Sequence, residues 1–200
     1  MIAALVFAAC SSGSGSKSVD NICKKMVQDP AFKEFCLTSY DSNKDGKVSM
    51  EEAAAVERME ISGLGIQSLA GIEYFTGLKY LDCSNNELKT LSTAGLGSLQ
   101  TLVCNNNLEL VSLNVSGSPE LFFLYAGFTS ITSLDLSAQH SLVKCWLGNT
   151  ALSALDLSAC PKIADIEVNS CLALKSLRLS PEVNTDNIRI LKSSKLEIEQ

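Results

Sequence analysis

Residues 41–52, DSNKDGKVSMEE, place oxygen-bearing residues at the spacing that a calcium-binding loop requires. Such a loop takes oxygen ligands from its positions 1, 3, 5, 7, 9 and 12 and has glycine at position 6. Gly46 is the sixth residue here, and the ligand positions are Asp41, Asn43, Asp45, Lys47, Ser49 and Glu52. Lys47 would contribute its backbone carbonyl, and Glu52 would contribute both carboxylate oxygens. The spacing therefore predicts calcium as the bound cofactor.

The residues on either side of this loop are expected to form two helices that hold it. Asp29 and Pro30 are a favourable N-cap and first helical residue, and residues 31–40 carry apolar side chains at helical spacing. Residues 50–57 contain EEAAA, which favours a helix. Residues 29–58 thus resemble an EF-hand helix–loop–helix.

EF-hands generally occur in pairs, whereas this sequence contains a single such loop, with Lys44 and Lys47 inside it. We therefore expect a dissociation constant on the order of 10⁻⁵ to 10⁻³ M. The alternative is a turn rich in Asp, Asn and Gly that binds no metal.

A repeat of 21 or 22 residues follows the loop. Its units open with apolar residues at positions 56, 78, 99, 121, 142 and 163, and their fourth and sixth residues are apolar or small. The ninth residue is Asn86 or Asn107 in two units and Thr or Cys in three later ones, which predicts a looser asparagine ladder there. This pattern resembles the leucine-rich-repeat family over about residues 56–180. The resemblance implies an α/β leucine-rich-repeat solenoid, mainly of short parallel strands, in which each coil buries the apolar side of the next.

Other segments are expected to complete the solenoid. A second phrase of alternating apolar residues recurs at 110–116, 131–137, 152–158 and 174–180, and predicts a strand on the opposite wall of each coil. The predicted order is a signal and tether (1–18), an EF-hand-like cap (19–55), the solenoid (56–182) and a C-terminal cap (183–200). The EF-hand-like segment would cover the open end of the stack, as such arrays require.

The third and fifth residues of each unit are expected to point away from the core. Tyr80, Phe123, Tyr125 and Trp146 occupy these positions, although only 6% of the residues are aromatic. Exposed apolar area usually marks an interaction site, and Tyr and Trp are favoured anchors. We expect the four to bind a protein or a glycan on the concave face. Ordinary packing between neighbouring coils is the alternative.

The cysteines suggest an exported protein. Cys10 follows nine apolar residues, and residues 7–10 resemble the cleavage box of bacterial lipoproteins. That resemblance implies a lipid on Cys10, a flexible tether at residues 11–18 and a place in the cell envelope or at the cell surface. A signal peptide cleaved elsewhere is the alternative. Cys23 and Cys36 could form a disulfide. Cys83 and Cys104 occupy the same inward position in neighbouring coils and are expected to be buried thiols, with a disulfide between them as the alternative.

The remaining features narrow the function. A net charge of −6 argues against nucleic acid and against an anionic membrane surface as partners, because both require a basic protein surface. Contact with a membrane is therefore expected only through the lipid anchor. A hydrolase would have to use His140, the single histidine, and no nucleophile motif accompanies it. The sequence therefore resembles a bacterial leucine-rich-repeat lipoprotein: a non-catalytic, calcium-stabilised binding module. The alternatives are a structural spacer or subunit of an envelope complex and, more weakly, a hydrolase.

Overall fold

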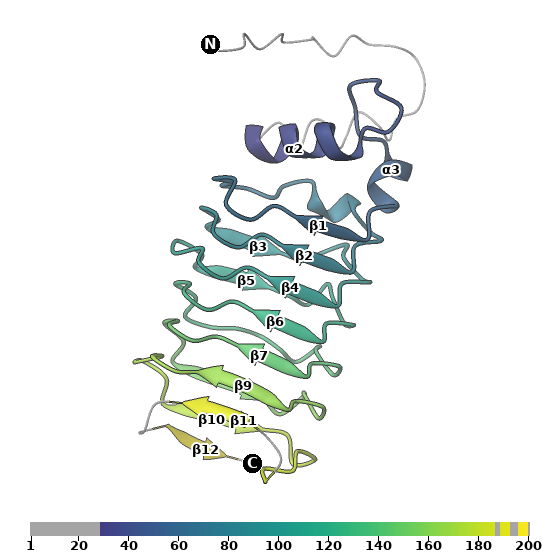
Figure 1. The fold of residues 1–200 in the computed structure, drawn as a ribbon. Coiled ribbons are helices and arrows are strands. Elements are labelled where there is room, and N and C mark those ends of the chain that lie inside the picture. The colour runs from purple at the N-terminus through teal and green to yellow at the C-terminus, as the bar shows by residue number, and fades with distance from the viewer. Residues whose placement is uncertain (1–28, 187–188, 193–195, 200) are drawn as a thin grey trace.

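The computed structural model describes residues 29–186, 189–192 and 196–199 of the 200-residue chain. These residues wind into a stack of coils, with two helices across the N-terminal end (Figure 1). The helices are α2 (Pro30–Tyr40) and α3 (Met50–Ala54), and one short 3-10 helix, η1 (Ile72–Tyr74), lies in the first coil. The coils thus form a parallel β-solenoid. An α/β solenoid was expected, but the two α-helices of the described chain both precede the coils.

One sheet runs the length of the stack, and we call it the front sheet. Its strands are all parallel, in the order β1-β2-β4-β6-β7-β9-β11. They span Arg58–Glu60, Tyr80–Asp82, Thr101–Val103, Phe123–Tyr125, Lys144–Trp146, Asp165–Val168 and Arg189–Lys192.

The middle residue of each strand forms the core. Leu81, Leu102 and Leu124 are aligned in register and fully buried, as are Cys145 and Ile166 below them. Side chains alternate along a strand, so the residues on either side of each middle residue face outward. The predicted repeat and its inward ladder are confirmed.

Buried asparagines tie the first coils together. The side-chain amide of Asn107 donates to the carbonyls of Cys83 and Cys104, and its Oδ1 accepts from the Leu88 amide. Thr129 occupies the position of Asn107 in the next coil. Within the described chain, its hydroxyl donates only to the Ala126 carbonyl, which belongs to its own coil. The ladder is thus looser at Thr129, as predicted, whereas Thr150 Oγ1 and Cys171 Sγ again meet across two coils at 3.2 Å.

The back wall is less regular than the repeat predicts. β3 (Thr90–Ser92) pairs with β5 (Ser112–Asn114), and β10 (Ser176–Leu179) lies between β8 (Ala154–Leu157) and β12 (Glu197–Glu199). The prediction of a strand at 131–137 is wrong. The middle inward residue there, Leu134, is only partly buried, whereas the equivalent residues of the neighbouring back strands, Leu113 and Leu155, are buried.

The helix α2 packs against the first coil. Phe32 and Cys36 are fully buried, and the Phe32 ring lies 6.4 Å from that of Phe75. Asp29 caps the helix by accepting from the Phe32 amide, as predicted, and its other oxygen accepts from the backbone amides of Gln67 (2.6 Å) and Ser68 (2.9 Å). One buried carboxylate therefore both starts α2 and holds it on the solenoid.

The six cysteines of the described chain are free and buried. Burial raises the pKa of Cys104 and of Cys160 to about 12, and that of Cys83 well above its usual range. Cys83 and Cys104 are thus buried thiols, as predicted. Cys36 is also free, while Cys23 and Cys10 lie outside the described residues. Of the helices that are described, none is long and apolar enough to cross a membrane.

Candidate functional site

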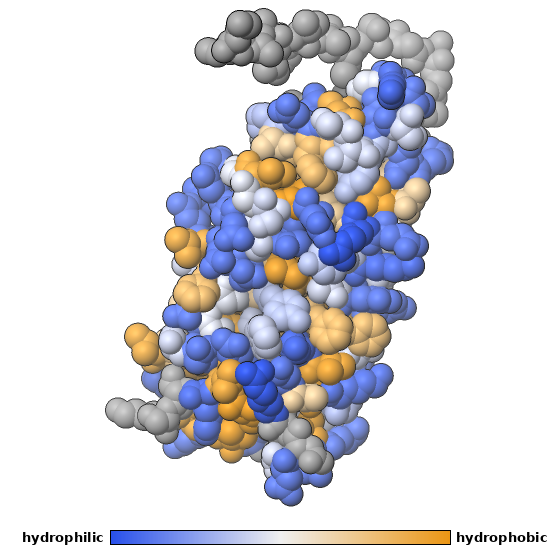
Figure 2. Space-filling view, in the orientation of Figure 1, coloured by the Kyte–Doolittle hydropathy of each residue, from blue (hydrophilic) through white to orange (hydrophobic). Residues whose placement is uncertain are grey.

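The outer face of the front sheet carries a hollow of about 660 Å³. All four predicted binding residues line it: Tyr80, Phe123, Tyr125 and Trp146. They come from β2, β6 and β7, and the structure brings them together because these strands and β4 are consecutive in the sheet. Figure 2 shows that pale and orange groups interrupt the blue surface at about mid-height of this face.

Two glycines make the hollow. Gly127 and Gly148 stand two residues beyond Tyr125 and Trp146, where neighbouring coils have Ser84, Asn105 or Asn169. A Cβ atom on Gly127 would lie 2.9 Å from the Gly148 carbonyl oxygen. The floor is therefore backbone, and the side chains around it form walls.

The aromatic walls are ordered by contacts with one another. The rings of Tyr125 and Trp146 meet edge to face, with centroids 5.1 Å apart and an angle of 87° between the planes, an arrangement that aromatic quadrupoles favour. Phe123 is 37% exposed. The Trp146 indole nitrogen is buried and has no hydrogen-bond partner within the described chain. The walls therefore combine exposed ring surface with a buried donor that has no partner among the described residues.

Phe128 belongs to the hollow and was not predicted. It is 51% exposed and has a left-handed backbone, with φ of 55°. The equivalent turn residues in other coils are Asn85, Asn106, Asn149 and Ser170, all with φ of 55–58°. Asparagine tolerates this conformation, whereas a bulky residue there is strained. An aromatic residue at a turn position that is Asn or Ser in the equivalent coils was the signal in the sequence that would have found it.

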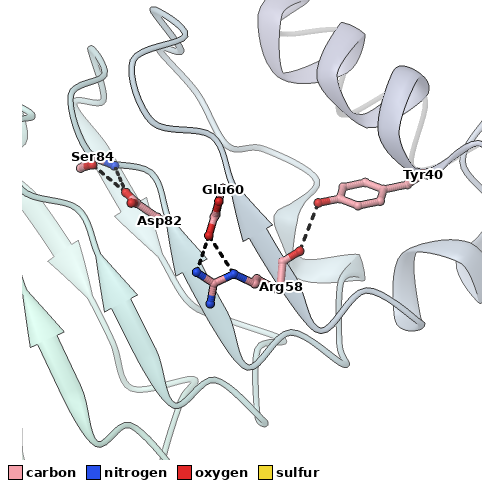
Figure 3. A network of polar contacts seen from close by, with 5 residues as sticks. All are labelled: Tyr40, Arg58, Glu60, Asp82 and Ser84. Carbon is pink, nitrogen blue, oxygen red and sulfur yellow. Dashed lines mark hydrogen bonds and ion pairs between the residues drawn. The ribbon is translucent and has the colours of Figure 1, made fainter.

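Cations already lie against aromatic rings on this face. The Arg58 guanidinium lies 3.7 Å from the Tyr80 ring centroid, and Glu60 binds it, with Nε to Oε1 at 2.8 Å (Figure 3). Lys144 Nζ lies 4.6 Å from the Trp146 ring centroid and 3.5 Å from an Asp165 carboxylate oxygen. Each cation therefore has both a ring and a carboxylate.

The loop between α2 and α3 is held by its own side chains. The Asp41 oxygens accept from the amides of Asp45 (3.1 Å) and Gly46 (2.8 Å), and Asn43 Oδ1 also accepts from the Asp45 amide (2.9 Å). Asp45 Oδ1 accepts from the Lys47 amide. Gly46 has φ of 81°, which glycine adopts without strain.

Glu52 and Ser49 close the loop. They form a reciprocal cap at the start of α3, and Glu52 Oε1 also accepts from the Ser42 hydroxyl at 2.6 Å. The Ser42 hydroxyl and the Ser49 amide lower the pKa of Glu52 from 4.5 to about 2. Within the part of the chain that is described, no three His, Cys, Asp or Glu side chains gather closely enough to hold a metal ion. The six predicted ligand residues thus share one loop, while its carboxylates are occupied by backbone amides and hydroxyls.

His140 has a structural contact. Its Nδ1 lies 2.9 Å from the Ala159 carbonyl oxygen, on the exposed surface between coils.

The chain matches no protein-family model and no curated protein. Among solved structures it is similar to the functional domain of InlJ from Listeria monocytogenes, described as including a cysteine ladder, with a TM-score of 0.62 and 22% identity. That match covers 77% of this chain and 38% of InlJ.

Two further structures are similar. The leucine-rich-repeat domain of the type III effector XCV3220 (XopL) has a TM-score of 0.60 and 23% identity, covering 80% of this chain and 71% of that one. The internalin InlF from Listeria monocytogenes has a TM-score of 0.57 and 17% identity, covering 88% and 65%. The chain thus spans less than two thirds of either Listeria protein. From the repeat, the register and these similarities together, the chain has the leucine-rich-repeat fold.

Proposed function

We propose that the protein is a non-catalytic binding module that recognises another protein through the hollow on its front sheet. The observation that carries this proposal is that five aromatic side chains gather around one glycine floor, with Phe123 and Phe128 more than one third exposed. Exposed apolar groups gathered in a recess mark interaction sites, and the few residues that carry most of the binding energy at interfaces are enriched in Trp and Tyr. The similar internalins and XopL domain share the fold, which is compatible with this role.

Tyr125→Ser and Trp146→Ser are each expected to weaken binding at least about thirtyfold, because such anchors contribute about 2 kcal/mol or more. A peptide display library supplies the ligand, and calorimetry compares the affinity of a selected peptide for each protein. Leu172→Ser is the matched control, because Leu172 is 94% exposed and lies outside the hollow. If folded Tyr125→Ser and Trp146→Ser proteins bind every selected peptide as tightly as the parent does, the hollow is not the binding surface.

We also propose that the loop at 41–52 binds calcium and stabilises the cap. Two observations support this proposal. All six ligand positions of the loop carry residues that can supply oxygen ligands. In addition, side-chain oxygens of Asp41 and Asn43 both accept from the Asp45 amide, so they lie close together. Calcium would have to draw the Glu52 carboxylate away from Ser42. Because α2 packs on the first coil, an ordered loop would strengthen the end of the stack.

Calcium at about 100 times its dissociation constant is expected to stabilise the protein by about 2.7 kcal/mol. EDTA should lower the melting temperature, and hydrogen exchange should rise first in α2 and β1. Asp41→Asn should abolish the calcium response, because position 1 of such loops requires aspartate, whereas Asp186→Asn, an exposed change of the same charge, should retain it. An identical melting curve for protein shown by metal analysis to be calcium-free would contradict the proposal.

Export and attachment to the cell envelope through Cys10 complete the proposal. They rest on the amino-terminal sequence alone, because Cys10 lies outside the described residues. A tethered solenoid would present the front sheet to partners outside the cell.

A further inference from the structure

On the front sheet, aromatic rings and carboxylates occur side by side three times. In two of these places a cation of the chain lies between them: Arg58 with Tyr80 and Glu60, and Lys144 with Trp146 and Asp165. Arg189 adds a second cation to Asp165, with a 3.2 Å contact. On this surface, a ring and a carboxylate that lie side by side thus bind a cation between them.

The third place is the hollow, and it has a carboxylate without a cation. Glu167 lines the hollow and is the strand neighbour of Trp146. It is half-buried, and no ion pair involves it among the described residues. A Cβ atom placed on Gly148 would lie 3.1 Å from Glu167 Oε1, so the carboxylate leans over the glycine floor. Glu167 is therefore directed into the hollow.

The ring surface for a cation is also free there. Arg58 lies over Tyr80, and Lys144 lies over Trp146 and is already paired with Asp165. Among the described residues, the rings of the hollow left without a cation are therefore those of Phe123, Tyr125 and Phe128. Phe128 is half exposed at a turn where the equivalent coils have asparagine or serine. The hollow thus offers flat aromatic walls, a glycine floor and one unpaired negative charge.

We propose that the hollow receives an arginine side chain of the partner protein, with its guanidinium stacked on the aromatic walls and bonded to Glu167. This inference rests on the proposed function and names the chemistry of the partner. A guanidinium is planar, stacks on aromatic faces and binds carboxylates through two parallel hydrogen bonds, whereas an ammonium is a strongly hydrated point charge. The net charge of −6 favours a cationic partner over the whole surface.

The single tryptophan makes the site directly observable. Trp146 is the only Trp of the chain and lines the hollow, so its fluorescence reports binding. The full-length protein is titrated with N-acetyl-arginine N-methylamide, with the corresponding lysine compound, and with N-acetyl-citrulline N-methylamide, which is neutral and has nearly the same shape. The arginine compound should give a saturable change, and the citrulline compound should bind about tenfold more weakly or worse.

Two variants test the named contacts. Glu167→Gln should weaken arginine binding about tenfold, whereas Glu120→Gln, an exposed change of the same charge outside the hollow, should leave it unaltered. Phe128→Asn should weaken it several-fold, and the protein should remain folded because asparagine holds the same turn conformation at Asn85, Asn106 and Asn149.

The outcomes separate this inference from the proposed function. No saturable change with the arginine compound, equal binding of citrulline, tighter binding of lysine, or an unaltered affinity in Glu167→Gln each overturns the arginine assignment. The proposed function is then still judged by the selected peptides and the Tyr125→Ser protein. Saturable binding of methyl N-acetylglucosaminide in place of arginine would point to a glycan and overturn both.

Discussion

Replacing Asn107 with alanine is expected to lower the free energy of unfolding by about 3–4 kcal/mol. The side chain is fully buried and satisfies three backbone groups, the carbonyls of Cys83 and Cys104 and the amide of Leu88. Alanine would leave all three without this partner in the core, and each unpaired buried group costs about 1–3 kcal/mol, less than additively. Urea unfolding followed by circular dichroism measures the change.

Asn114→Ala is the control for this experiment. Asn114 is exposed, and its Oδ1 accepts from the backbone and hydroxyl of Ser116 two residues away. Water can replace those bonds, so the expected loss is under about 1 kcal/mol. Equal stabilities of the two variants would mean that Asn107 does not hold the coils together.

Gly117→Ala is expected to destabilise the protein by about 1–3 kcal/mol or more. A Cβ atom there would lie 2.3 Å from the Thr93 carbonyl oxygen and 2.7 Å from Ala94 Cα. Both atoms are backbone of the preceding coil, so the two coils would have to move apart. Thermal unfolding measures the loss, and hydrogen exchange should locate it around β3 and β5.

Gly97→Ala provides a matched comparison. No atom lies within 4 Å of a Cβ placed on Gly97, which is exposed. Alanine there also restricts the unfolded chain, so its effect should be within about 0.5 kcal/mol or slightly stabilising. If Gly117→Ala were as well tolerated as Gly97→Ala, the close approach of the two coils would not be a requirement of the fold.

The residue type changes along the column of side chains that begins with the buried asparagines. Asn86 and Asn107 cross-link the coils nearest the cap, whereas Thr129, Thr150 and Cys171 hold that column further along. Cys171 makes two contacts with the preceding coil, because its sulfur lies 3.1 Å from the Leu147 carbonyl oxygen and 3.2 Å from Thr150 Oγ1. The lining of the hollow runs from Tyr80, beside the coils with asparagine, to Glu167, so the hollow spans this change in side-chain chemistry.

The sequence by itself determined the repeat, the inward ladder and the outward direction of Tyr80, Phe123, Tyr125 and Trp146. The reason is local: a strand alternates its side chains, and a constant period brings equivalent residues into register. The N-cap at Asp29 and the spacing of the loop residues were also readable, because capping and turn chemistry depend on neighbours a few residues apart. The strand expected at 131–137 failed because its stability depends on packing across the coil, which periodicity alone does not report.

Only the tertiary structure decided the shape and charge of the hollow. Its floor exists because Gly127 and Gly148 are adjacent across two coils, and Phe128 joins it because its left-handed backbone turns that ring toward the same space. Glu167 contributes its charge by leaning over a glycine about twenty residues away in the chain. Such contacts arise between side chains that are distant in sequence, so they depend on how the coils stack and on where a missing side chain leaves room.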